Sequence, residues 1–198
     1  MARHKAGRQG KRWGCLGLLA ACLLLGGCAA GFFTAQGQQA LQAGQYQAAM
    51  QAFTAALVEN PRSVAALTGL GIAYYKTAAY RAAIETLEEA KGLDADNPEA
   101  RLYLGLAYLR SGQDARAREE LLAYAQTTRR RVANQIAEAL AVLEQEGAEE
   151  EAVRTLVALT IEDWAYREQE MQALERRLWE ATAFGRRRSG IGFVIRLR

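Results

Sequence analysis

Small and large apolar residues recur through the first part of the chain with a period of 34 residues. Gly37, Gly71 and Gly105 mark this period, and apolar residues follow each glycine at steps of three and four. Such steps place side chains on one face of a helix. Twelve and sixteen positions after each glycine come a small and then a large residue, as in Ala83 and Leu87. The pattern predicts repeated helical hairpins in which small residues face large ones.

Prolines divide this pattern into three hairpins. Pro61 and Pro98 each follow an asparagine, and a residue before proline is biased away from the helical conformation. We therefore expect units at about 30–63, 64–97 and 98–131. One hairpin cannot bury its apolar face alone, so about three stacked units and a terminal cap are needed for stability. The predicted fold class is all-α, with the hairpins stacked in a solenoid.

The spacing resembles the tetratricopeptide repeat (TPR), a helical hairpin of about 34 residues. The middle unit matches its signature at Leu67, Leu70, Gly71, Tyr74, Ala78, Tyr80, Ala83, Leu87 and Ala90. The other two units depart from it at Gln36, Ala40, Arg101, Asp114 and Tyr124. The resemblance implies a concave groove that binds a segment of another protein.

In TPR arrays the first helix of each unit lines this groove. The matching positions here are Gln38, Leu41, Thr68, Ile72, Tyr75, Lys76, Leu102, Leu106, Leu109 and Arg110. Clamp members of the family hold a peptide carboxylate with Lys and Asn side chains at six positions, where this chain has Thr34, Gln38, Thr68, Ile72, Leu102 and Leu106. Because the predicted groove is largely apolar, we expect it to take an amphipathic helix or an extended peptide of a protein partner.

Two further helices and a tail are predicted after the repeats. Residues 132–146 carry one apolar stripe and are expected to cap the third unit, while 149–184 form a long amphipathic helix. The long helix either extends the solenoid, folds back over the groove, or docks on another protein. Its candidate docking residues are Trp164, Met171, Leu174, Leu178 and Trp179. The basic tail at 185–198 is expected to be either disordered or a strand that adds to a partner's sheet.

The first 27 residues have the layout of an export signal. A basic start precedes an uncharged apolar run from Trp13 to Gly27, which is shorter than the roughly 20 residues that span a bilayer. The Leu-Gly-Gly-Cys sequence ending at Cys28 resembles a bacterial lipobox. That resemblance implies cleavage before Cys28, lipid on its sulfur and amine, and, from Ala29, sorting to the periplasmic side of the outer membrane. An uncleaved anchor helix is the alternative.

The charge of the chain and its histidine and cysteine content argue against several classes of function. The formal charge of +3 comes from the signal, because the chain after it carries 20 basic and 22 acidic residues. It therefore lacks the basic stripe of a nucleic-acid-binding protein. The single histidine is His4, and all three cysteines lie at or before Cys28. A histidine-based triad or metal site cannot be built, so we predict a protein that is not an enzyme and needs no cofactor or metal.

These observations predict a lipid-anchored adaptor for a protein partner in a cell-envelope complex. TPR lipoproteins that resemble this layout include components of secretin or pilus machinery, outer-membrane assembly machinery and peptidoglycan machinery. One alternative is a structural lipoprotein that self-associates through the long helix. The other is an enzyme or small-ligand carrier that uses the carboxylates of Glu149 to Glu151. Adjacent residues of a helix point in different directions, which disfavours the carboxylate enzyme.

Overall fold

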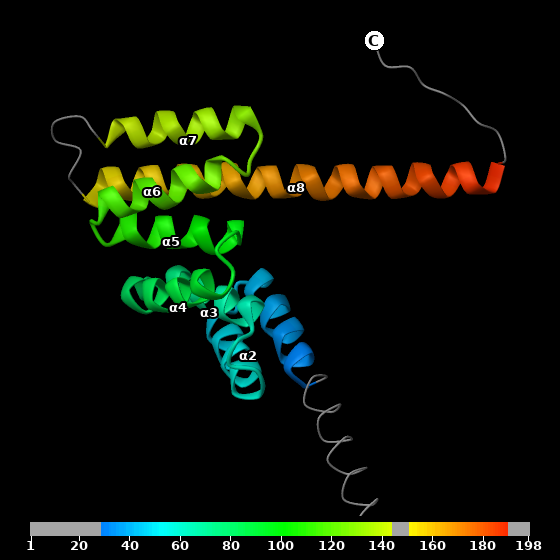
Figure 1. Cartoon of the computed structure of the whole chain (residues 1–198), viewed down its shortest axis with the longest axis horizontal. Coiled ribbons are helices and arrows are strands. Elements are labelled where there is room, and N and C mark those ends of the chain that lie inside the picture. Colours follow the sequence, from blue (N-terminus) through cyan, green and yellow to red (C-terminus); the bar gives the residue numbers. More distant parts are fainter. Residues whose placement is uncertain (1–28, 144–150, 190–198) are drawn as a thin grey trace, which may run out of the picture. The chain divides into compact units, whose positions relative to one another are not determined.

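The computed structural model describes residues 29–143 and 151–189, with side chains described as far as residue 181 (Figure 1). These residues form helices joined by short turns, and no strand occurs among them. The helices are residues 29–42, α2 (Tyr46–Glu59), α3 (Val64–Lys76), α4 (Tyr80–Leu93), α5 (Pro98–Arg110), α6 (Asp114–Ala125), α7 (Arg130–Val142) and α8 (Glu151–Ser189). The predicted all-α hairpin fold is confirmed.

The chain divides into two compact units, Met1–Glu120 and Leu121–Arg198. In the first unit, α2 packs on α3, α3 on α4, and α4 on α5. The first helices of the second and third hairpins, α3 and α5, also contact each other. Side-by-side first helices are the arrangement that produces one continuous face along a solenoid.

Capping residues fix where the first helix of each later hairpin begins. The Ser63 hydroxyl accepts a hydrogen bond from the backbone N–H of Ala66 at 3.3 Å. Asn97 caps α5 in the same way, accepting from the N–H of Ala100 at 2.9 Å, with Pro98 at the first helical position. Such caps satisfy N–H groups that have no partner within the helix. The asparagine and proline of this join therefore start a helix as well as ending the previous unit.

The turn inside each hairpin uses a left-handed residue at the same repeat position. Gly44 and Gly112 have φ of 71° and 75°, and Ala78, which lies 34 residues from each of them, has φ of 59°. Glycine adopts this conformation without the steric cost that a Cβ imposes. The middle hairpin therefore carries backbone strain that the other two hairpins avoid.

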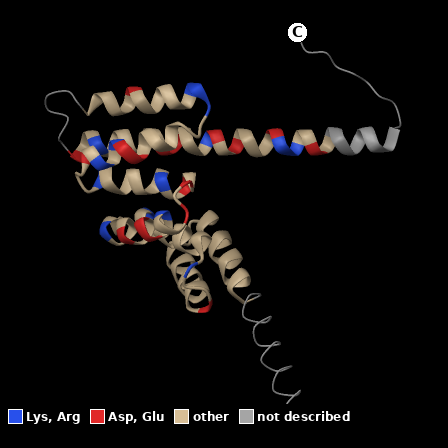
Figure 2. Cartoon of the chain, viewed as in Figure 1, with Lys and Arg blue, Asp and Glu red and all other residues tan. Residues whose placement is uncertain are grey.

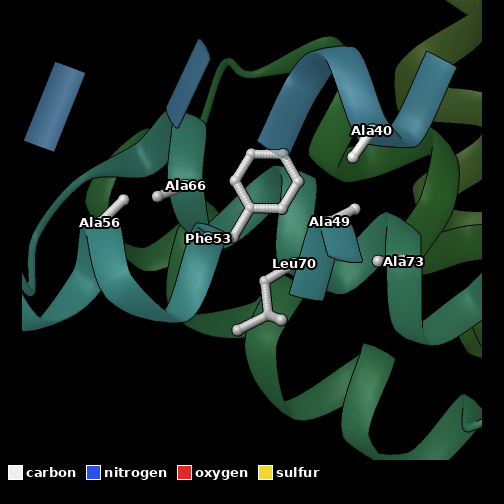
Figure 3. Close-up of a cluster of buried hydrophobic side chains, with 7 residues drawn as sticks. All are labelled: Ala40, Ala49, Phe53, Ala56, Ala66, Leu70 and Ala73. Atoms are coloured by element: carbon white, nitrogen blue, oxygen red, sulfur yellow. The ribbon is translucent and has the colours of Figure 1, made fainter. Parts of the chain in front are cut away.

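Phe53 fills the centre of the first unit's core (Figure 3). Its side chain is fully buried among small residues, and the cluster contains Ala40, Ala49, Phe53, Ala56, Ala66, Leu70 and Ala73. A Cβ added to Gly37 would lie 2.6 Å from Phe53 Cε1, and one added to Gly69 would lie 2.2 Å from Phe53 Cζ. The same holds for Gly71, whose added Cβ would lie 2.5 Å from Leu87 Cγ. Small residues face large ones in the seams, as the sequence predicts.

A buried carboxylate joins three helices of the first unit. Glu120 on α6 accepts from Lys91 Nζ of α4 at 2.5 Å and from Arg101 Nη1 of α5 at 3.3 Å. Arg101 Nε also donates to the backbone oxygen of Ala95 at 2.8 Å. A buried carboxylate is tolerated when it is paired in this way. The arginine that replaces the aromatic residue of the TPR signature is therefore part of an ion-pair network.

In the second unit α7 packs on α8. Val132, Ile136 and Leu140 of α7 are buried, which accounts for the apolar stripe predicted at 132–146. Val157 and Ile161 are buried residues of α8. Arg129, just before α7, pairs with Glu168 at 3.1 Å and also with Glu175, so charged contacts extend the packing along α8. The first part of α8 is thus a structural element of this unit.

The sequence predictions for the two ends of the chain have different outcomes. The structure corrects the predicted end of the long helix at residue 184, because α8 continues through Gly185 to Ser189. A single glycine costs only about 1 kcal/mol in a helix, which is not enough to end one. The signal and Cys28 lie outside the described residues, as do Glu149, Glu150 and the predicted strand. No described helix is long and apolar enough to cross a membrane.

Candidate functional site

The predicted groove residues differ widely in exposure. Gln38 and Lys76 are exposed, and Leu41 and Arg110 are half-buried. The remaining six are buried: Thr68, Ile72, Tyr75, Leu102, Leu106 and Leu109. Leu102, Leu106 and Leu109 have almost no exposed surface, so a partner cannot contact them in this conformation. A surface for a partner must therefore be sought among the other residues.

Three predicted groove residues meet in a pocket of about 320 Å³ in the first unit, which we call the groove pocket. Its lining comes from the helix at 29–42, from α3 and from the start of α5. The lining residues are Gln38, Val64, Ala65, Thr68, Gly69, Ile72, Asn97 and Glu99. These helices are the first helices of three successive hairpins, which is where the TPR resemblance implies a ligand groove.

The polar groups of the groove pocket are poorly satisfied by the protein. Thr68 is 3% exposed, and its Oγ1 has no hydrogen-bond partner among the described residues. Glu99 is half-buried in the first turn of α5, and burial raises the pKa of its carboxyl group. Asn97 uses its Oδ1 to cap α5, while its amide NH₂ donates to no described residue. A buried polar group without a partner, such as the Thr68 hydroxyl, is unusual in a folded protein, and a ligand is one way to satisfy it.

Sequence reasoning missed Asn97 and Glu99, because the resemblance supplied groove positions from the middle of each first helix only. Glu99 lies one residue after Pro98, at the start of a first helix that stacks beside α3. The position of the start of a helix relative to a neighbouring helix depends on their packing. The one available signal was the Asn-Pro-Glu sequence, which marks an acid in a first helical turn.

Tyr75 and Arg110 form an aromatic cluster with other side chains of the repeats. The ring of Tyr75 lies 5.9 Å from that of Tyr80 and 5.5 Å from that of Tyr103, centroid to centroid. The guanidinium carbon of Arg110 lies 5.2 Å from the centroid of Tyr80, within the range of a cation–π contact. Both residues therefore contribute to packing within the protein.

A wider depression of about 650 Å³ lies over the first described helix. Alanine, glycine and uncharged polar residues line it: Ala30, Gly31, Thr34, Ala35, Gln38, Gln39, Gln42, Asn60 and Ser63. The helix at 29–42 carries no charged residue, α2 carries only Glu59 and α3 only Lys76, as the tan ribbons in Figure 2 show. Charge near the groove of the first repeats is therefore confined to a few side chains.

The candidate docking residues of α8 fall into two groups. Trp164 is half-buried and, with Met171, lines a pocket of about 300 Å³ between α7 and α8. Leu174, Leu178 and Trp179 are 50%, 58% and 71% exposed. The helix thus changes from a packed element to one with exposed apolar side chains along its length. The role of these residues in docking stays a prediction.

No group of three His, Cys, Asp or Glu side chains in the described part of the chain could hold a metal ion. Glu149 and Glu150, which the enzyme alternative invokes, lie outside that part.

The family model of the tetratricopeptide repeat matches residues 40–92 and 79–134. These residues are therefore TPR units, which are generally protein-interaction modules. No curated protein matches the chain significantly.

The chain is similar to several solved structures. The type III secretion translocator chaperone SycD of Yersinia enterocolitica is 19% identical, with a TM-score of 0.48, over 70% of this chain and 93% of that chain. The TPR domain of Arabidopsis OM64 is 16% identical, with a TM-score of 0.47, over 65% and 93%. The TPR2B domain of yeast Sti1, solved in a complex with pHsp70, is 15% identical, with a TM-score of 0.49, over 69% and 98%.

Proposed function

We propose that this protein is an adaptor that holds a segment of a protein partner in the groove of its TPR units, tethered to a membrane by lipid on Cys28. The observation that carries the proposal is the groove pocket, which lies where the first helices of three hairpins meet and contains polar groups that have no partner among the described residues. A groove between rigid helices can hold an extended or helical segment without reorganisation of the backbone. The proposed partner belongs to a cell-envelope complex.

The tether rests on the sequence before the repeats. The Leu-Gly-Gly-Cys sequence ends at Cys28, and the first described helix begins one residue later. Each buried CH₂ of an acyl chain contributes about 0.8 kcal/mol, so two or three chains hold a protein at a membrane almost permanently. Lipid on Cys28 would therefore keep the TPR units close to the bilayer surface. Ala29 favours the outer membrane, with the repeats on the periplasmic side.

Replacing Cys28 with serine is expected to release the protein from the membrane fraction or to leave it unprocessed, and to abolish labelling with a radioactive fatty acid. The far-UV circular dichroism of the purified variant should match that of the native chain, because Cys28 precedes the described helices. Cys22→Ser is the matched control and should leave fractionation and labelling unchanged. Full lipid labelling of the Cys28 variant would refute the tether.

A second candidate function is self-association through α8. Its support is the exposed apolar surface of Leu174 and Leu178, which lie four residues apart and therefore on one helical face. The buried residues of α8 end near Glu168, so this exposed face continues the helix beyond its packed part. Two copies could bury these faces against each other.

Site-specific photocrosslinking in membranes tests the adaptor and separates it from self-association. A photoreactive amino acid at Gln38 or Ala65, both exposed at the groove pocket, should give the same crosslinked partner. Placed at Arg81, whose side chain is 95% exposed on α4, it should give none of that product. A product of two copies of this chain, formed from Leu174 and not from Gln38, would favour self-association. Identical products from Gln38 and Arg81 would contradict a groove-specific adaptor.

A further inference from the structure

We propose that the groove pocket binds the ammonium group of a lysine side chain from the partner segment, with Glu99 as its counter-charge. This inference rests on the proposed adaptor function and specifies the chemistry of its ligand. It differs from capture of a peptide carboxylate, for which the pocket lacks cations: none of its lining residues in the described chain is Lys or Arg.

Thr68 supplies the first argument, because its hydroxyl is buried and differs from those of three other helical threonines. Thr34, Thr86 and Thr160 each donate to the carbonyl oxygen four residues earlier, at 2.7 to 2.8 Å. This local bond is the usual way for a threonine within a helix to satisfy its hydroxyl. Thr68 Oγ1 is buried without such a bond and lines the groove pocket. It is therefore available as an acceptor for a ligand.

Glu99 supplies the second argument, because it differs from the buried carboxylates elsewhere in the chain. Glu120 is paired with Lys91 and Arg101, and Glu168 is paired with Arg129. Glu99 forms no ion pair or hydrogen bond with any described residue. The positive end of the α5 dipole favours an acid in the first turn, but it does not restore the water lost from a half-buried carboxylate. A cation in the pocket would compensate for the lost hydration of this carboxylate.

The shape and apolar lining of the pocket fit a lysine side chain. Val64, Ala65, Gly69 and Ile72 provide an apolar wall along α3, against which the methylene groups of a lysine can pack. An ammonium group carries three donors and no acceptor, and it can bond the carboxylate of Glu99 and the hydroxyl of Thr68 together. The helix at 29–42 adds no charge of its own. Glu99 is thus the only charged residue among those that line the groove pocket.

The test uses the full-length ¹⁵N-labelled protein in non-ionic detergent. The probe is Nα-acetyl-lysine methylamide. The control probe is the same molecule acetylated on Nε, which has no charge, keeps one N–H donor and gains a small acetyl group. Titration with the charged probe should shift the amide signals of Thr68, Ile72 and Glu99, and the acetylated probe should shift them far less. Equal shifts with both probes, or shifts spread over the surface, would overturn the proposal.

Three variants test which side chains bind the charged probe. Glu99→Gln is expected to weaken binding of the charged probe about tenfold, the loss that corresponds to one charge-assisted hydrogen bond. Thr68→Val keeps the shape of the side chain, removes the hydroxyl, and should weaken binding several-fold. Glu59→Gln removes an exposed acid at the end of α2 and should have no effect. Unchanged binding in the folded Glu99→Gln protein would refute the role of this carboxylate.

The same variant separates the two proposals. If Glu99→Gln still crosslinks to the partner from Gln38 and the charged probe gives no localised shift, the adaptor stands and the lysine subsite falls. If wild-type protein binds the charged probe at Thr68 but no partner crosslinks from Gln38 or Ala65, the subsite stands and the adaptor falls.

Discussion

Replacing Phe53 with alanine is expected to lower the free energy of unfolding by about 3–5 kcal/mol, the range measured for aromatic side chains removed from well-packed cores. Phe53 is fully buried and contacts both Gly37 of its own hairpin and Gly69 of the next one. The other buried members of its cluster are alanines and Leu70, and alanine has no side-chain freedom with which to fill the cavity. The loss should therefore fall within that range.

Urea unfolding followed by far-UV circular dichroism measures this effect. Tryptophan fluorescence is unsuitable as the reporter, because the described tryptophans, Trp164 and Trp179, both lie in α8. Phe32→Ala is the matched control: Phe32 is 66% exposed on the helix at 29–42, so its removal should change stability by no more than about 0.5 kcal/mol. Similar losses for Phe53→Ala and Phe32→Ala would mean that Phe53 does not join the first two hairpins.

The hairpin fold could be predicted from the sequence because its determinants are local and repeated. Gly71 and Leu87 recur at fixed spacing, and the structure places them in contact. Gly69 was missed, although an added Cβ there would approach Phe53 most closely of all. It falls outside the TPR signature, and only the packing of one hairpin on the next shows why it must be small.

The groove was predicted less well than the fold. Periodicity identifies the face of a helix that points away from its hairpin partner, but not whether something else covers that face. Leu102, Leu106 and Leu109 lie on such a face and are buried, while Gln38 and Thr68 line a pocket. Spatial neighbours from different hairpins, such as Thr68 and Glu99, cannot be paired from spacing alone. The composition of a pocket between helices therefore required the structure.

The apolar stripe of the long helix illustrates the same limit. Val157 and Ile161 are buried, whereas Leu174 and Leu178 continue the apolar pattern and are exposed. The sequence predicts an amphipathic helix over both parts, because the hydrophobic period does not change. The part of α8 that packs within the chain depends on how far α7 reaches, and α7 begins at Arg130, next to the Arg129 that pairs with Glu168. Exposed apolar residues of this kind commonly mark a surface for another protein.

Replacing Gly69 with alanine is expected to destabilise the protein by about 1–3 kcal/mol, the usual cost of overpacking a core. The sign of the change in stability distinguishes the effect of packing from that of helix propensity. Alanine is favoured over glycine within a helix by about 1 kcal/mol, so helix propensity alone predicts a gain in stability. The added Cβ would lie 2.2 Å from Phe53 Cζ, and the ring of Phe53 is fully buried. Steric overlap should therefore outweigh propensity.

Gly92→Ala is the matched control, since Gly92 lies within α4 and an added Cβ would meet no atom within 4 Å. Its expected effect is a gain of up to about 1 kcal/mol in the same urea experiment. Phe53→Leu should reduce the cost of Gly69→Ala, because the smaller side chain leaves room for the new methyl group. The two changes together should then be less destabilising than the sum of their separate effects. Strict additivity would mean that Gly69 and Phe53 do not share one packing space, and the close approach of the first two hairpins would then need another cause.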